Sequence, residues 1–204
     1  MLVLDHLVIA AETLEAGIAH VSDRLGVEMT PGGKHPAMGT HNALVALGPG
    51  TYLEVIAVDP AAPSPEAPRW FRLDRFSGPP RLVSWVCRTD DLDEMLRHAP
   101  PDAGRPLPLA RGDLAWRMAV NPLGEMPFDG AYPMLIEWET ARHPADELPH
   151  LGLELQRLEV RHPDAGALRV ALDGLLSDPR VEIAMGPFAL VAEIETPRGT
   201  RSLT

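Results

Sequence analysis

The feature that most constrains the fold is a repeat in the order of the predicted elements. A strand pattern at 2–10 and a helix pattern at 11–26 precede three further strand patterns, and the same order returns from Arg81. Apolar residues recur at helical spacing in the helix pattern, and the strands are short apolar runs bounded by Gly, Pro or Asp. We therefore predict two βαβββ units, about 80 residues apart. Duplicated units usually pair and place their shared face around one site.

The repeat divides the chain into four segments. Six prolines lie between the two units, at positions 60, 63, 65, 68, 79 and 80. Such a stretch is typical of a connector. The residues after the second unit are predicted to form β-α-β-β, which either extends one sheet or covers an edge. We predict an α+β fold whose curled mixed sheets surround a cavity, with a first module at 1–58, a connector at 59–80, a second module at 81–140 and a C-terminal extension of the same globular domain at 141–204.

The length of the connector bears on how the modules pair. About 22 residues are enough to let both modules of one chain meet, so we expect pairing within the chain, while a homodimer remains an alternative.

Composition excludes several classes of partner. Eighteen basic residues against 29 acidic ones give a formal net charge of −11, which disfavours binding to nucleic acid or to an anionic membrane. A single cysteine, Cys87, permits no internal disulfide and no paired-cysteine metal site, which suits a cytoplasmic location. We expect neither a secretory signal nor a membrane span. Motifs for phosphate loops, dinucleotide sites, serine hydrolases and zincins are absent. The expected partner is a small molecule.

Three ionisable residues on apolar strands are the main candidates for a site. Strand alternation places His6 on a face with Leu4 and Val8, and Glu54 lies within "TYLEVIAV". Glu137, in "YPMLIEWE", holds the same last-strand position in the second unit. A buried carboxylate needs a cation, a hydrogen-bond network or a raised pKa. A divalent metal (Zn, Fe, Mn, Ni or Co) on His6, Glu54 and Glu137 would satisfy all three and leave positions open for a bidentate oxygen substrate.

The chain resembles the vicinal oxygen chelate superfamily, and within it the glyoxalase-like domain group. The resemblance is carried by "LDHLVIA", "GTHNALVALGPGTYLEVIAVDP", "GDLAWRMAV" and "YPMLIEWE" and covers roughly residues 2–140. It implies metal ligands on the first and last strands of each module, and His6, Glu54 and Glu137 match three of these positions. The fourth position is the one in the second module that aligns with His6. Ser84 occupies it, and serine is a poor ligand for these metals. Three ligands could suffice, His41 could complete the set, or the metal could be absent.

Further residues are assigned from their surroundings. His35 and His41 flank a glycine-containing loop, and His41 is the better candidate for proton transfer because it opens the strand that leads to the Glu54 hairpin. Arg117 could meet a substrate carboxylate or neutralise Glu137.

Aromatic residues could line the cavity. Tyr52, Trp116 and Trp138 lie on predicted strands and would form apolar walls around a ligand. An error of one residue in strand register would exchange the roles of Glu137 and Trp138. His143 precedes a proline and is interpreted as part of a turn.

Two functions follow. In the first, a metal on His6, Glu54 and Glu137 supports a lyase, isomerase or ring-cleaving dioxygenase acting on a small oxygen-bearing molecule, with Glu137 also in the catalytic set and His41 or a water moving protons. In the second, a metal-free protein of the same fold binds or sequesters a small molecule. Ser84 favours the second.

Overall fold

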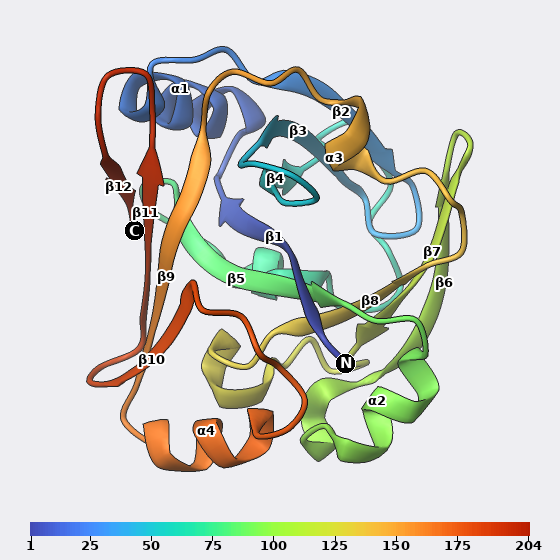
Figure 1. The fold of residues 1–204 in the computed structure, drawn as a ribbon. Helices are drawn as coiled ribbons and strands as arrows, with labels where there is room; N and C mark the ends of the chain where they lie inside the picture. The colour runs from blue at the N-terminus through green and yellow to red at the C-terminus, as the bar shows by residue number, and fades with distance from the viewer.

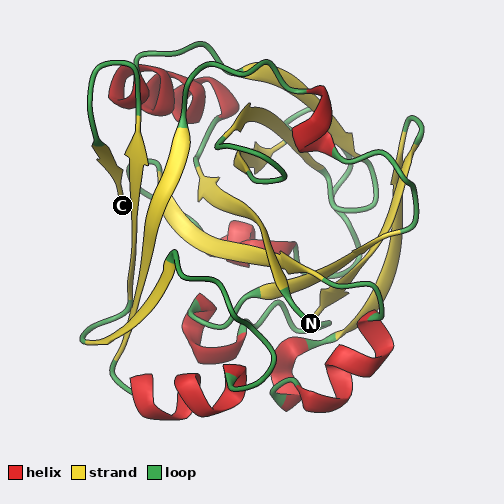
Figure 2. Ribbon diagram, viewed as in Figure 1, coloured by secondary structure: helices red, strands yellow, loops and turns green.

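A computed structural model describes residues 1–204 (Figure 1). The elements in chain order are β1 (Val3–Ala10), α1 (Leu14–Leu25), β2 (Thr30–His35), β3 (Thr40–Ala46), β4 (Tyr52–Val58), η1 (Trp70–Arg75), β5 (Arg81–Arg88), α2 (Leu92–His98), η2 (Pro101–Ala103), β6 (Arg105–Arg111), β7 (Leu114–Val120), η3 (Pro127–Gly130), β8 (Met134–Trp138), α3 (Pro144–Glu147), β9 (Glu154–His162), α4 (Ala165–Leu172), β10 (Val181–Met185), β11 (Ala189–Glu195) and β12 (Arg201–Leu203). The strands run through the centre of the molecule and the helices lie around them (Figure 2).

The two βαβββ modules share one curled sheet of eight strands. Its order is β2-β3-β4-β1-β5-β8-β7-β6. Within each module the first strand pairs parallel with the last, β1 with β4 and β5 with β8, and the modules join where β1 pairs antiparallel with β5. The predicted α+β fold of paired modules is confirmed, and the pairing occurs within one chain.

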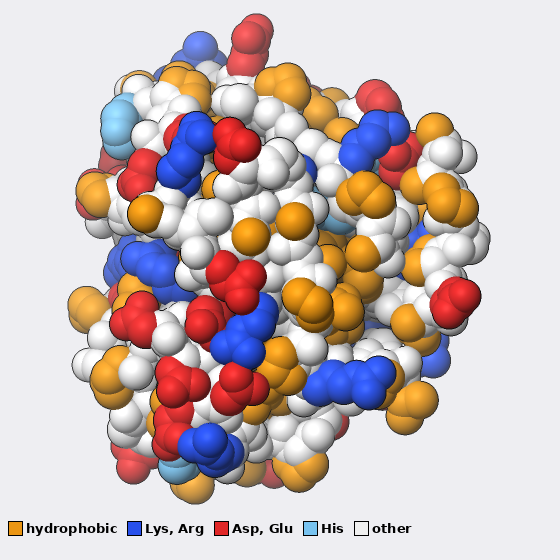
Figure 3. Space-filling view, turned by 90° about the vertical axis from the view of Figure 1, so that its right-hand side faces the viewer, with side chains coloured by type: hydrophobic (Ala, Val, Ile, Leu, Met, Phe, Trp, Pro, Cys, Tyr) orange, Lys and Arg blue, Asp and Glu red, His pale blue; other side chains and the backbone are white.

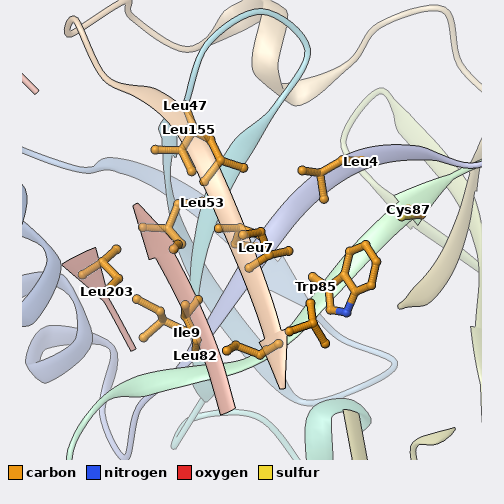
Figure 4. Packing of buried hydrophobic residues seen from close by; sticks show 14 of the residues in the cluster. Leu4, Leu7, Ile9, Leu47, Leu53, Leu82, Trp85, Cys87, Leu155 and Leu203 are labelled. Atoms are coloured by element: carbon orange, nitrogen blue, oxygen red, sulfur yellow. The ribbon is translucent and has the colours of Figure 1, made fainter. Parts of the chain in front are cut away.

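The C-terminal segment forms a separate sheet. Four strands in the order β10-β9-β11-β12 make this sheet, so it adds no strand to the large one, and the three-residue strand β12 was not predicted. A cluster of 28 buried apolar side chains, including Leu4, Trp85 and Leu158, draws on both sheets. Figure 4 shows Leu155 of β9 beside Leu47, and Leu203 of β12 near Ile9 of β1. Burial of this apolar surface holds the second sheet on the first.

Helix ends follow the local sequence. The Thr13 side chain accepts a hydrogen bond from the backbone N–H of Ala16 at the start of α1, and Gly26 ends this helix with φ of 71°. The start of α2 is capped by Asp91, which accepts from the N–H of Glu94. None of the helices combines the length and apolar character needed to cross a membrane.

A bulge in β1 alters the predicted alternation. Leu4 is opposite Cys87 and His6 is opposite Val86, so Asp5 is an extra residue on this strand. Leu4 consequently packs in the core between the two sheets, whereas Val8 packs in the cluster on the other face. The expectation that His6 shares a face with Leu4 was wrong for this reason.

Candidate functional site

The cavity lies on the face of the large sheet that the C-terminal sheet leaves free. Its free volume is about 30 Å³, and about 400 Å³ when the adjoining space that is open to solvent is included. Its polar lining comes from β1, β2, β3, β4 and β6 and consists of His6, His35, Asn42, Glu54 and Arg111. Its aromatic lining consists of Tyr52, Trp70, Phe71, Trp116 and Trp138. On the face of the molecule that Figure 3 presents, hydrophobic side chains gather around a hollow. A polar floor between aromatic walls is the usual form of a small-molecule site.

Asp5 holds the His6 ring in one orientation. Because of the bulge, the carboxylate of Asp5 and the His6 ring meet, with Oδ1 of Asp5 2.6 Å from Nδ1 of His6. Burial alone would raise the pKa of Asp5, but hydrogen bonds from His143 and His6 hold it below its usual value. The ionised carboxylate can only accept, so Nδ1 of His6 carries the proton and Nε2 is free to act in the cavity.

His6 faces Glu54 across the parallel pair β1 and β4. Its Nε2 is 3.7 Å from Oε2 of Glu54, and its ring stacks on Tyr52 with centroids 4.5 Å apart. Burial, with the charges of Asp5 and Glu54, raises the pKa of the Tyr52 phenol, which therefore stays neutral. The arrangement gives His6 one fixed nitrogen and one nitrogen beside a carboxylate, which suits a general base.

Asn42 links the carboxylate of Glu54 to the guanidinium of Arg111. Its Nδ2 donates to Oε1 of Glu54 at 2.6 Å, and its Oδ1 accepts from Nη1 of Arg111 at 3.1 Å. The same Nη1 donates to Nε2 of His35 at 3.3 Å. Because Arg111 can only donate, Nδ1 of His35 carries the proton and lies 3.1 Å from the Thr40 hydroxyl. Burial and the Arg111 charge lower the pKa of His35 to about 3, so its ring is neutral.

Residues 4–176 match the family described as the glyoxalase-like domain. The chain belongs to this family. The predicted resemblance to the vicinal oxygen chelate superfamily is thereby confirmed. No curated protein matches the sequence.

Solved structures resemble this glyoxalase-like domain at low identity. A protein described as hypothetical from Staphylococcus aureus is 11% identical with a TM-score of 0.59 and covers 99% of this chain and 84% of its own. The Mn(II)-bound glyoxalase from Novosphingobium aromaticivorans is 10% identical, with a TM-score of 0.49 and coverage of 98% and 80%. Methylmalonyl-CoA epimerase from Mycobacterium tuberculosis is 23% identical, with a TM-score of 0.42 and coverage of 68% and 88%. The likeness to the Staphylococcus aureus protein concerns the fold alone.

Two residues predicted for the site lie on the opposite side of the glyoxalase-like sheet. Ile136 and Trp138 of β8 line the cavity, so the intervening Glu137 points away from it. Glu137 instead accepts from the N–H of Leu92 at 3.0 Å and pairs with Arg117. Arg117 also pairs with Asp93 at 2.8 Å. Their positions contradict the predictions of Glu137 as a metal ligand and catalytic residue and of Arg117 as a substrate contact. The other alternative for Arg117, that it neutralises Glu137, is confirmed.

The roles predicted for two histidines are exchanged. Asn42 and Leu44 of β3 line the cavity, so His41 lies on the other face of that strand, while His35 lines the cavity with Trp70 and Trp116 around it. The sequence favoured His41 because it opens the strand that leads to the Glu54 hairpin, but the alternation of that strand turns its side chain away from the cavity.

Several residues in or next to the cavity were not predicted. Asn42 and Arg111 are polar residues near a Gly-rich loop and a turn, positions where polar side chains are ordinary. His143 was interpreted as a turn residue, yet its Nε2 donates to Oδ2 of Asp5 at 2.9 Å while Nδ1 accepts from the N–H of Ala145. The one sequence feature that could have indicated this contact was the pair Asp5-His6 at the centre of an apolar first strand.

The donor set does not fit the predicted metal. His6 and Glu54 converge, but Glu137 faces the other way, and the Ser84 hydroxyl donates to the carbonyl of Trp85 at 3.3 Å. No group of three or more His, Cys, Asp or Glu side chains in the chain is arranged so that it could hold a metal ion. Catalytic zinc sites have three protein ligands, and the related two-histidine, one-carboxylate iron site also has three. Two donors, one of them already bonded to Asn42, fall short of either.

Proposed function

We propose that this glyoxalase-like protein binds a small oxygen-bearing molecule in the cavity and moves one of its protons with His6 as the base, without a resident metal. The observation that carries the proposal is the orientation of His6. Its Nδ1 is held by the ionised Asp5 at 2.6 Å, and its Nε2 is directed toward Glu54 at 3.7 Å. A carboxylate on one nitrogen selects the tautomer and stabilises the imidazolium that forms when the other nitrogen takes a proton.

The chemistry that suits these groups is proton abstraction next to a carbonyl. The C–H bond breaks, its proton goes to Nε2 of His6, and the electron pair moves to the carbonyl oxygen as an enolate. Glu54, fixed by Asn42, stabilises the imidazolium. Return of the proton to the same carbon or to a neighbouring one gives an isomerase, and loss of a leaving group gives a lyase.

The second candidate is capture without chemistry. The feature that favours it is the aromatic wall, in which the rings of Trp116 and Trp138 lie 5.6 Å apart beside the stacked His6 and Tyr52. Aromatic walls bind apolar ligand surface whether or not a reaction follows.

Proton exchange separates the two candidates. The probe is 2-oxobutanoate in D₂O, whose carbonyl adjoins both a carboxylate and an exchangeable C–H. We expect the protein to accelerate loss of the C3 proton signal in ¹H NMR, and His6→Gln to reduce the accelerated rate by roughly 10²–10⁴-fold. Binding of the probe without exchange supports capture.

Two controls give this result its meaning. His41→Gln changes a histidine outside the cavity and should keep the wild-type rate. Chelator-treated protein shown by metal analysis to be free of transition metal should also keep it. Equal rates in His6→Gln and wild type, or a rate that depends on one equivalent of bound metal, would contradict the proposal.

A further inference from the structure

We infer that Arg111 selects the ligand of this cavity and that the ligand is a small organic carboxylate whose anionic end rests on the guanidinium. This inference rests on the proposed function for the use of the cavity and names the substrate class. Three features carry it: the lack of an acidic partner for Arg111, the neutrality of its neighbours, and a backbone shaped to admit its side chain.

Arg111 is a cation without a carboxylate. Its hydrogen bonds run from Nη1 to Asn42 and to His35, at 3.1 and 3.3 Å, and it takes part in no ion pair. Arg117, on the partner strand β7 of the same hairpin, pairs with both Glu137 and Asp93. A guanidinium has five N–H donors arranged to match a carboxylate, and most of those of Arg111 have no protein acceptor.

The neighbours of Arg111 leave its charge uncompensated. Asn42 is uncharged, and burial together with Arg111 keeps the pKa of His35 near 3, so the imidazole is neutral around pH 7. An anion in the cavity would be the first negative charge to contact this guanidinium. Hydrogen bonds between charged partners are the strong ones, above all where two parallel bonds form.

Gly32 and Gly33 make room for this arrangement. A Cβ on Gly33 would lie 2.5 Å from Cδ of Arg111, and one on Gly32 would lie 2.1 Å from Oδ1 of Asn42. The N–H of Gly33 donates to the same Oδ1 at 2.7 Å. The strand register shifts between Pro31 and Lys34, so both glycines lie in an irregular part of β2. Here β2 and β6, the outermost strands of the sheet, approach each other across the cavity.

The polarity of the cavity sets the orientation of the ligand. Asn42 lies between the two charges, with Glu54 on its amide nitrogen and Arg111 on its oxygen. Glu54 repels an anion from the His6 end, so a carboxylate binds at Arg111. The other end of the ligand then lies toward His6 and Glu54, where the proposed proton transfer takes place.

A matched pair of unreactive probes tests the inference. Isobutyrate and isobutyramide share a shape and differ in charge, and binding is followed through the indole N–H signals of the four tryptophans in ¹H–¹⁵N NMR. Wild type should bind isobutyrate roughly tenfold or more tightly than isobutyramide, and Arg111→Gln should abolish the preference. Arg111→Lys should retain part of it. Arg105→Gln, an exposed change on the same strand, should leave it intact.

Equal binding of the two probes by wild type, no saturable binding of either, or an undiminished preference in Arg111→Gln overturns the inference. If Arg111→Gln fails to fold, the arginine Nε–H signals of wild type are measured instead. The signal that is missing in Arg111→Lys belongs to Arg111, and isobutyrate must shift it. His6→Gln should keep the preference, so failure of the base and failure of the anion site are distinguishable.

Discussion

Asp5 illustrates how single residues in this molecule depend on partners far away in the chain. This fully buried carboxylate accepts from His6, from Nε2 of His143 at 2.9 Å, from Nε1 of Trp138 at 3.1 Å and from Arg88 at 3.4 Å. The hydrogen bonds outweigh the desolvation that burial imposes and keep the pKa low. A strand sequence reveals the buried acid but not the donors, two of which follow more than 130 residues later.

At the same scale, His35 should make stability depend on pH. Its folded pKa is about 3, whereas an unfolded histidine has a pKa of about 6.5. Between these values the unfolded state binds more protons, so the free energy of unfolding should fall as the pH drops from about 6.5 toward 3. Urea unfolding across this window should show the slope in wild type and a weaker slope in His35→Gln. His150→Gln, an exposed control, should match wild type, and an unchanged slope in His35→Gln would show that the ring is protonated in the native state.

Within single elements, alternation decides which side chains reach the cavity. In β8, Leu135 packs in the core between the sheets and Ile136 in the cluster on the cavity side. Glu137 follows the side of Leu135 and lies at the first turn of α2, where a carboxylate satisfies a free N–H and suits the helix dipole. The sequence predicted the strand but assigned its acid to the cavity side.

The role of Glu137 at this helix has a measurable consequence. Glu137→Ala should lower the free energy of unfolding by about 1 kcal/mol through the lost hydrogen bond to the N–H of Leu92. It should leave isobutyrate binding and proton exchange unchanged. Glu139→Ala, at the more exposed neighbouring acid, should have little effect on either quantity. Loss of ligand binding in Glu137→Ala with the fold intact would return this residue to the site.

Across the whole molecule, one face of the large sheet carries the cavity and the other carries the C-terminal sheet. The cavity takes Glu54 from the first module and Arg111 from the second, so neither module contains the site by itself. The opposite face packs against β9 and its neighbours through side chains such as Leu158, which is fully buried. The C-terminal sheet therefore supports the scaffold and contributes no residue to the cavity lining, to which Pro144 of α3 is the one contribution from the C-terminal segment.

The shared core predicts joint unfolding of the two sheets. Leu158→Ala should lower the free energy of unfolding by about 2–5 kcal/mol, because a buried cavity replaces the side chain. Near-UV and far-UV circular dichroism should still change together in one transition. Val170→Ala, which shortens a side chain that is 78% exposed on α4, serves as the control. Separate transitions by the two probes would indicate that the C-terminal sheet unfolds independently.

The elements and their duplication could be predicted from the sequence, because apolar periodicity, turn residues and helix caps are local properties. The sequence also indicated His6, Glu54, Tyr52, Trp116 and Trp138 for the site, and these five side chains line the cavity. Tertiary structure alone decided the rest. The bulge at Asp5, the outward positions of Glu137 and His41, and the meeting of Arg111 with His35 and Asn42 depend on strand pairing and on the closure of the sheet. These are contacts between residues far apart in the chain, and a shift of one residue on any strand reverses which side chains face the cavity.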